Sequence, residues 1–147
     1  LKEENLDAFT QRFLKLAADE IIPEQMTPQI DIDAVLDLQD INAKFMSELK
    51  KMNPFGPDNQ KPVFCSLGVK DYGTSKLVGK DLEHIKLELI DDKSNTPIHG
   101  IAFGMHQHNT HIKNMKPFNI CYTIEENTYN GNTSLQLMVK DIKENDI

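Results

Sequence analysis

The sequence lacks the features of a membrane or secreted protein. Its 147 residues contain no tryptophan and only two cysteines, and no apolar run is long enough to cross a bilayer. No signal-peptide pattern is present. Cys65 and Cys121 both lie in strand-like runs, where lone cysteines behave as small hydrophobic residues of a reducing compartment. We therefore expect a cytoplasmic protein, with a disulfide as the less favoured alternative.

Patterns that carry catalysis are also missing. The sequence has no Ser-His-Asp order, no glycine-rich phosphate loop and no carboxylate pair at a useful spacing. Its histidine cluster, His106, His108 and His111, has no Cys or carboxylate at metal-ligand spacing, and a closed zinc site needs four ligands. We expect a solvated helix surface here, no metal site and no catalytic residue. A small metalloenzyme is the least favoured alternative.

Positive charge is scarce, with a net charge of −7. Residues 1–59 carry 6 Lys and Arg against 12 Asp and Glu, whereas residues 60–147 carry 10 against 11. Residues 61–86 hold 5 Lys against 3 acids, a balance of +2. The whole chain therefore lacks the basic footprint of a dedicated nucleic-acid binder. A local basic patch remains possible, because steering depends on local charge.

The first 52 residues predict two helices. Apolar residues recur at helical spacing from about residue 3 to 20, and this stripe needs a partner surface that 20 residues cannot supply. Ile30 and Ile32 alternate with acids and indicate a short strand. A second helix is expected from about residue 38 to 52, capped by Asp37 or Asp40. The first stripe comprises Leu6, Phe9, Phe13, Leu16 and Ala17.

A proline-rich corner follows, from Asn53 to Phe64. Its prolines remove backbone donors, so neither a helix nor a central strand can continue through it. Gly56 allows a sharp reversal of the chain. Phe55 is the lone large apolar residue of the turn, and we expect its ring to be a buried anchor with a structural role.

After the corner, the apolar period becomes two, which predicts strands. Five strands are expected, with a weakly helical segment at 105–113 between the third and fourth, and a loop at 126–133 before the fifth. This is the order of a five-stranded OB-fold β-barrel, here preceded by an N-terminal helical segment, an α+β fold. The inward residues expected are Val63, Cys65, Leu67 and Val69 in the first strand, which continues at 76–78; Ile85, Leu87 and Leu89 in the second; Phe118, Ile120, Tyr122 and Ile124 in the fourth; and Leu135, Leu137 and Val139 in the fifth. The third strand is expected at 98–103.

Three short patterns resemble a known family. They are Pro54-Phe55-Gly56-Pro57 with Asn59 and Pro62-Val63-Phe64; Val78-Gly79-Lys80 with His84-Ile85-Lys86; and Ile101-Ala102-Phe103. Over most of the chain they resemble the C-terminal region of the RecJ family of single-stranded-DNA-specific exonucleases. The resemblance implies that residues 1–52 are the end of a DHH-associated domain with a connecting helix, and that residues 53–147 are the OB-fold domain.

The resemblance also implies a function for the parent protein. RecJ enzymes degrade single-stranded DNA from 5′ to 3′ in recombination and repair, with Mn²⁺ or Mg²⁺ in the catalytic core. The aspartates and histidines of their catalytic motifs are absent from residues 1–147. Because the chain begins at Leu1 instead of Met, we expect a piece of a longer protein, whose upstream DHH domain is its partner in the same chain.

A candidate DNA-binding face follows from the fold order. In OB folds the ligand crosses strands two and three, between the first-to-second and fourth-to-fifth loops. Here this predicts Lys76, Lys80, His84 and Lys86, with Tyr129 and Asn132 in the far loop. Lysine can pair with phosphate and tyrosine can stack on a base. The alternative is that these lysines are ordinary residues of a solvent-exposed strand face. The domain would then be a scaffold or protein-interaction domain that braces its neighbour.

Overall fold

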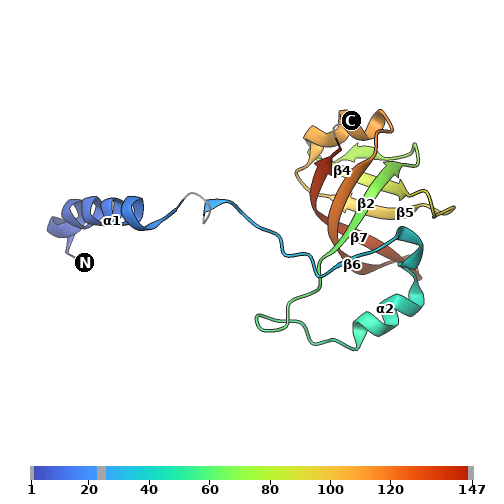
Figure 1. The fold of residues 1–147 in the computed structure, drawn as a ribbon, viewed down its shortest axis with the longest axis horizontal. Coiled ribbons are helices and arrows are strands. Elements are labelled where there is room, and N and C mark those ends of the chain that lie inside the picture. The colour runs from blue at the N-terminus through green and yellow to red at the C-terminus, as the bar shows by residue number, and fades with distance from the viewer. Residues whose placement is uncertain (1, 23–25, 146–147) are drawn as a thin grey trace. The chain divides into compact units, whose positions relative to one another are not determined.

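The computed structural model describes residues 2–22 and 26–145, apart from the side chain of Tyr129. The chain divides into two units, Leu1–Asp31 and Ile32–Ile147. All the strands that the structure describes belong to the second unit (Figure 1). The boundary expected at residues 52 and 53 lies inside this second unit.

The first unit is helical, as the spacing predicted. A short 3₁₀ turn, η1 (Glu3–Asn5), leads into α1 (Leu6–Glu20). The apolar stripe runs along α1 and is exposed: Phe9 and Phe13 stack with ring centroids 6.0 Å apart, yet each keeps more than half of its surface in solvent. The helix is therefore amphipathic, and its apolar face is exposed in this chain.

The second unit opens with a short strand and a helix. The strand is β1 (Ala34–Val35), so the strand expected at Ile30 and Ile32 was placed too early. It is followed by the 3₁₀ turn η3 (Leu38–Asp40) and by α2 (Ala43–Lys50). Asn42 caps α2, since its Oδ1 accepts a hydrogen bond from the Phe45 backbone N–H at 3.1 Å. The caps expected at Asp37 or Asp40 were wrong, and α2 is shorter than predicted.

Within residues 2–22 and 26–145, seven strands form one mixed sheet, not the five that the sequence predicted. The sheet order is β1-β2-β6-β7-β5-β4-β3, and β2 also pairs with β4. This extra pairing joins β2, β6, β7, β5 and β4 in a closed ring (Figure 1). The strands β1 and β3 are short additions to it. The strands after β1 are β2 (Phe64–Asp71), β3 (Lys76–Val78), β4 (His84–Ile90), β5 (Ile98–Ala102), β6 (Phe118–Tyr129) and β7 (Asn132–Glu144).

A bulge in β2 corrects the predicted inward face of that strand. The register against β6 shifts between Ser66 and Val69, and Gly68 has φ +65°. Phe64 and Ser66 are therefore buried and Leu67 is 58% exposed, whereas Cys65 and Val69 are buried as predicted. A strict period of two cannot follow a strand with an extra residue.

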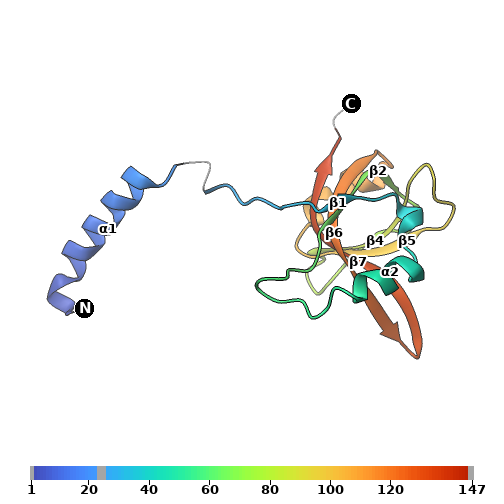
Figure 2. The ribbon, with the colours of Figure 1, turned by 60° about the horizontal axis from the view of Figure 1, so that its bottom comes forward.

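The expected loop at 126–133 was also wrong, because β6 and β7 form one long hairpin. Only Asn130 and Gly131 separate the two strands, with φ +50° and +79°. Asn-Gly is the preferred pair for a two-residue turn in which both residues need positive φ. Figure 2 shows the hairpin reaching past the other strands.

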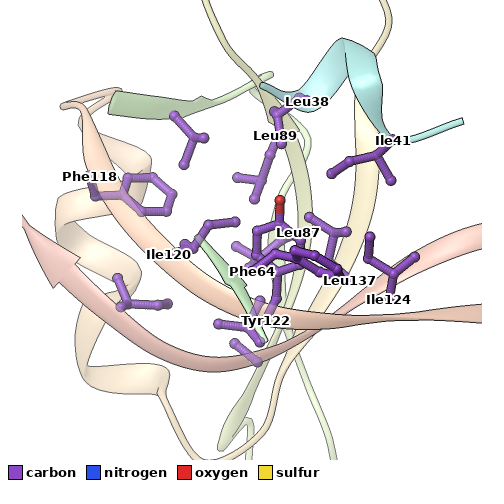
Figure 3. Close-up of a cluster of buried hydrophobic side chains, with 14 of the residues drawn as sticks. Leu38, Ile41, Phe64, Leu87, Leu89, Phe118, Ile120, Tyr122, Ile124 and Leu137 are labelled. Carbon is purple, nitrogen blue, oxygen red and sulfur yellow. The ribbon is translucent and has the colours of Figure 1, made fainter. Parts of the chain in front are cut away.

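The core fills the ring of strands. The inward residues predicted for β4 and β6 are confirmed, since all of them are buried. Ile112 is the buried residue of α3 (Asn109–Lys113), which follows the 3₁₀ turn η4 (His106–His108) and confirms the helical segment. Figure 3 shows Tyr122 among the core side chains. The Tyr122 hydroxyl lies 2.7 Å from Ser66 Oγ, which in turn donates to the Leu36 carbonyl at 2.8 Å.

The proline-rich corner is held by polar contacts instead of a buried ring. Asn59 Nδ2 donates to the carbonyls of Met52 and Pro54 at 2.7 and 2.9 Å. Phe55 is only half-buried and lines a surface cavity beside Leu49 and Ile124. The expectation of a fully buried anchor was therefore wrong.

Candidate nucleic-acid interface

One row of side chains crosses the outside of β3, β4 and β5. Lys76 of β3 pairs with Lys86 of β4, and Lys86 pairs with Ile101 of β5. Ile101 in turn pairs with Met138 of β7. Because paired residues of neighbouring strands share a face, and the neighbours of Lys86 along β4 are fully buried, the row faces outward. It joins two exposed lysines to a partly exposed apolar strip.

A second row contains two rings. His84 lies two residues before Lys86 in β4, so it shares the outward side. Phe103 follows the last residue of β5 and is 55% exposed. The ring centroids of His84 and Phe103 are 4.9 Å apart with an interplanar angle of 79°. We call the outward side formed by Lys76, His84, Lys86, Ile101 and Phe103 the β3–β5 face.

His84 is held in place from both sides. Its Nδ1 accepts a hydrogen bond from the Gly104 backbone N–H at 3.0 Å. Its Nε2 lies 3.2 Å from Glu83 Oε1. Both ring nitrogens therefore have partners within the chain, and the ring is better suited to orienting Phe103 than to contacting a phosphate.

The turn before β4 carries both signs of charge. Lys80 is exposed in this turn, one residue after Gly79, which has φ +97°. Hydrogen bonds from the backbone N–H groups of Glu83 and Asp81, together with the nearby His84, hold the pKa of Glu83 below its ordinary value. Glu83 is therefore a carboxylate at neutral pH, so the β3–β5 face has acidic neighbours.

The structure brings most of the predicted site residues together. Lys76, His84 and Lys86 lie on adjacent strands, with Lys80 in the turn that joins them. Tyr129 ends β6, opposite Asn132 of β7. The side chain of Tyr129 lies outside the described residues.

The sequence interpretation missed the apolar residues of the β3–β5 face, Ile101 and Phe103, and their neighbour Met138 of β7. The sequence of β5 did contain a pattern that indicates these outward apolar residues. Ala102 is the small buried residue between Ile101 and Phe103, and alternation places its two neighbours on the opposite side. Assigning Met138 to the same face required the pairing of β5 with β7.

Two of the three clustered histidines, His108 and His111, are not the solvated surface that we expected. His108 Nδ1 lies 2.7 Å from Glu144 Oε1, and His111 Nδ1 lies 3.2 Å from Glu144 Oε2. The His111 side chain is 9% exposed, and its Nε2 lies 3.1 Å from the Pro117 carbonyl. These contacts join α3 and its preceding turn to the end of β7, so His108 and His111 have a structural role, whereas His106 is exposed as expected.

Comparison with known families assigns the second unit to a protein family. A family model described as the RecJ OB domain matches residues 32–141. This chain belongs to the RecJ OB domain family. The match begins where the second unit begins, so β1 and α2 are part of this OB domain.

Two curated relatives of this chain are named single-stranded-DNA-specific exonuclease RecJ. The Haemophilus influenzae protein is 25% identical over 143 residues, which are 97% of this chain and 24% of the relative. The Bacillus subtilis protein is 25% identical over 142 residues, which are 96% of this chain and 18% of the relative. The chain thus spans a quarter or less of the length of these relatives.

Solved structures of RecJ from Thermus thermophilus share the fold. The complex with Mn²⁺ gives a TM-score of 0.75 at 17% identity, covering 100% of this chain and 20% of that one. The complex with Mg²⁺ gives a TM-score of 0.74 at 17% identity, covering 100% and 21%. At this identity the similarity concerns the fold alone.

The described part of this RecJ OB domain chain does not fit a metal centre. Residues 2–22 and 26–145 contain no group of three or more His, Cys, Asp or Glu that could hold a metal ion. The carboxylate of Glu144 is instead engaged by two histidines. Within the same ranges, no helix is long and apolar enough to span a membrane.

Proposed function

We propose that this chain is the single-stranded-DNA-binding OB-fold region of a RecJ-like 5′-to-3′ exonuclease of the cytoplasm, acting in recombination and repair. The name of the curated relatives supports the substrate class. In this proposal the closed ring of β2, β4, β5, β6 and β7 is the OB barrel. Catalysis, with its Mn²⁺ or Mg²⁺, belongs to the part of the protein outside this chain.

The observation that carries the proposal is the alignment of Lys76 and Lys86 on the β3–β5 face. Among the described residues, neither lysine has a carboxylate within 4.0 Å, and the same holds for Lys80. By contrast, Lys61 pairs with Glu125 at 2.7 Å, just before β2. Unpaired ammonium groups on an OB ligand face are suited to the phosphates of a single strand.

Replacing Lys76 and Lys86 together with Glu is expected to weaken binding to a labelled single-stranded oligonucleotide. Each single-strand phosphate contact contributes about 0.7 to the slope of log K against log salt, so two lost contacts lower the slope by about 1.4. The parent chain should bind with a Kd of about 10⁻⁴ to 10⁻⁶ M, the non-specific range. Fluorescence anisotropy at several salt concentrations measures both quantities.

A matched control separates the effect of the local site on affinity from the effect of the net charge. Lys44 on α2 and Lys116 before β6 are exposed and form no ion pair among the described residues. Changing both to Glu alters the net charge by the same amount and should leave affinity nearly unchanged. Equal losses in the two double variants would contradict a site on the β3–β5 face, as would a parent chain that does not bind at low salt.

The exposed face of α1 favours a second candidate function, that of a bracing domain. Phe9 and Phe13 form a ring pair, and such a pair is suited to burial against another protein surface. We propose that this helix is the end of a DHH-associated domain and packs against the upstream catalytic DHH domain. If the parent chain fails to bind DNA at low salt, this scaffold function leads.

A further inference from the structure

Phe103 is an exposed aromatic ring at the end of β5, in a sheet whose core buries three other rings. Phe64, Phe118 and Tyr122 are all 5% exposed or less, whereas Phe103 is 55% exposed. It stands where β5 ends, directly before Gly104, whose φ of +69° turns the chain away. The ring therefore projects at the edge of the β3–β5 face and does not serve the core.

The ring is nevertheless held in one orientation. His84 meets it edge to face at 4.9 Å. His84 is in turn fixed by the Gly104 N–H at Nδ1 and by Glu83 at Nε2. An aromatic group that is already oriented loses little conformational entropy on binding. His84 is therefore a positioning residue for Phe103.

Apolar and basic groups follow one another across the same outward side as the ring. Ile101 shares the outward side with Phe103, and Met138 is the register partner of Ile101. Lys86 is the partner of Ile101 on the other side, and Lys76 lies beyond it. A base lying on Phe103 would have its phosphate on the lysine side of the face.

We propose that Phe103 is a base-stacking platform, oriented by His84, and that it makes the β3–β5 face prefer single strands over duplex. This inference rests on the proposed function and extends it from the phosphates to the bases. A duplex hides the faces of its bases in the stack, whereas a single strand offers them. Stacking on a neutral ring tolerates any sequence, because every base has a π-face.

Phe103→Leu tests the platform while keeping an apolar side chain. Binding to oligo(dT) should weaken about tenfold, because leucine cannot stack on a base as phenylalanine does. Binding to an abasic strand of the same length should stay at the parent value, and the salt slope should not change. Phe9→Leu on α1 is the control, because Phe9 is also half-exposed, and it should bind both strands like the parent.

The absence of tryptophan from the sequence provides a second readout. In Phe103→Trp the new indole is the sole tryptophan, and oligo(dT) should quench its fluorescence while the abasic strand should not. Adding His84→Ala to Phe103→Trp should reduce this quenching, because the indole loses its orienting partner.

The outcomes distinguish this inference from the proposed function. A parent chain that binds oligo(dT), together with an unaffected Phe103→Leu and an unquenched indole, would overturn the stacking platform and leave the phosphate contacts standing. A parent chain that binds neither strand would overturn both.

Discussion

Leu87→Ala is expected to lower the free energy of unfolding by about 2–5 kcal/mol, the range for removing a buried leucine side chain. Leu87 lies in the middle of β4, points into the closed ring and has no exposed surface. The substitution leaves a cavity that the surrounding strands can fill only in part. Chemical denaturation followed by circular dichroism measures the change.

Leu67→Ala is the matched control for this prediction. A strict period of two places Leu67 inside the sheet, but the bulge at Gly68 leaves it 58% exposed. The same substitution there should cost less than about 1 kcal/mol, since surface changes are usually small. Similar losses at both positions would contradict the register of β2.

Alkaline pH is expected to destabilise the second unit through Tyr122. Burial raises the pKa of Tyr122 to about 12, although its hydrogen bond with Ser66 acts in the other direction. In the unfolded chain the pKa is about 10. Above pH 10 the unfolded state therefore loses the proton first, and stability falls as the pH rises towards 12. The loss from this group is about 1.4 kcal/mol at pH 11 and about 2 kcal/mol at pH 12.

Tyr122→Phe isolates this contribution. The variant should be less stable than the parent by about 0.5–1.5 kcal/mol at pH 7, because it lacks the hydrogen bond to Ser66. Between about pH 9 and 11.5 it should lose less stability than the parent does. Burial also raises the pKa values of Cys65 and Cys121, and these cysteines are present in both proteins. Parallel pH profiles would show that Tyr122 is accessible to solvent.

Local alternation predicted the parts of the fold where a strand is regular. In β4 the side chains alternate without interruption, so Ile85, Leu87 and Leu89 were all correctly placed inside. In β2 the extra residue at the bulge reverses the pattern, and Leu67 was misplaced. Bulges depend on the partner strand, which a single strand's sequence does not contain.

The prediction of a loop at 126–133 failed for a different reason. The tip of the long hairpin is rich in Asn and Thr, which are typical of loops when considered one residue at a time. The Asn130-Gly131 pair makes a two-residue turn that keeps β6 and β7 paired to their ends, with Tyr129 opposite Asn132. The turn chemistry was therefore in the sequence, but the polar composition outweighed it in our prediction.

The candidate face could be predicted only in its charged half. In β4, His84 and Lys86 alternate with buried residues, which identified the outward side of that strand, and Lys76 of β3 was assigned to the same face. The apolar half depends on pairings between strands that are far apart in the sequence, such as Ile101 with Met138. The orientation of His84 depends on the Gly104 N–H, 20 residues away, which no local pattern specifies.

The most direct test of a single-strand-binding face is a titration of the ¹⁵N-labelled chain with oligo(dT), followed by two-dimensional amide NMR at low salt. We expect the largest shift changes on β3, on β4, and at the end of β5 around Phe103, with α1 and α2 unaffected. Shift changes centred on α1 or α2, or none at millimolar oligonucleotide, would contradict it.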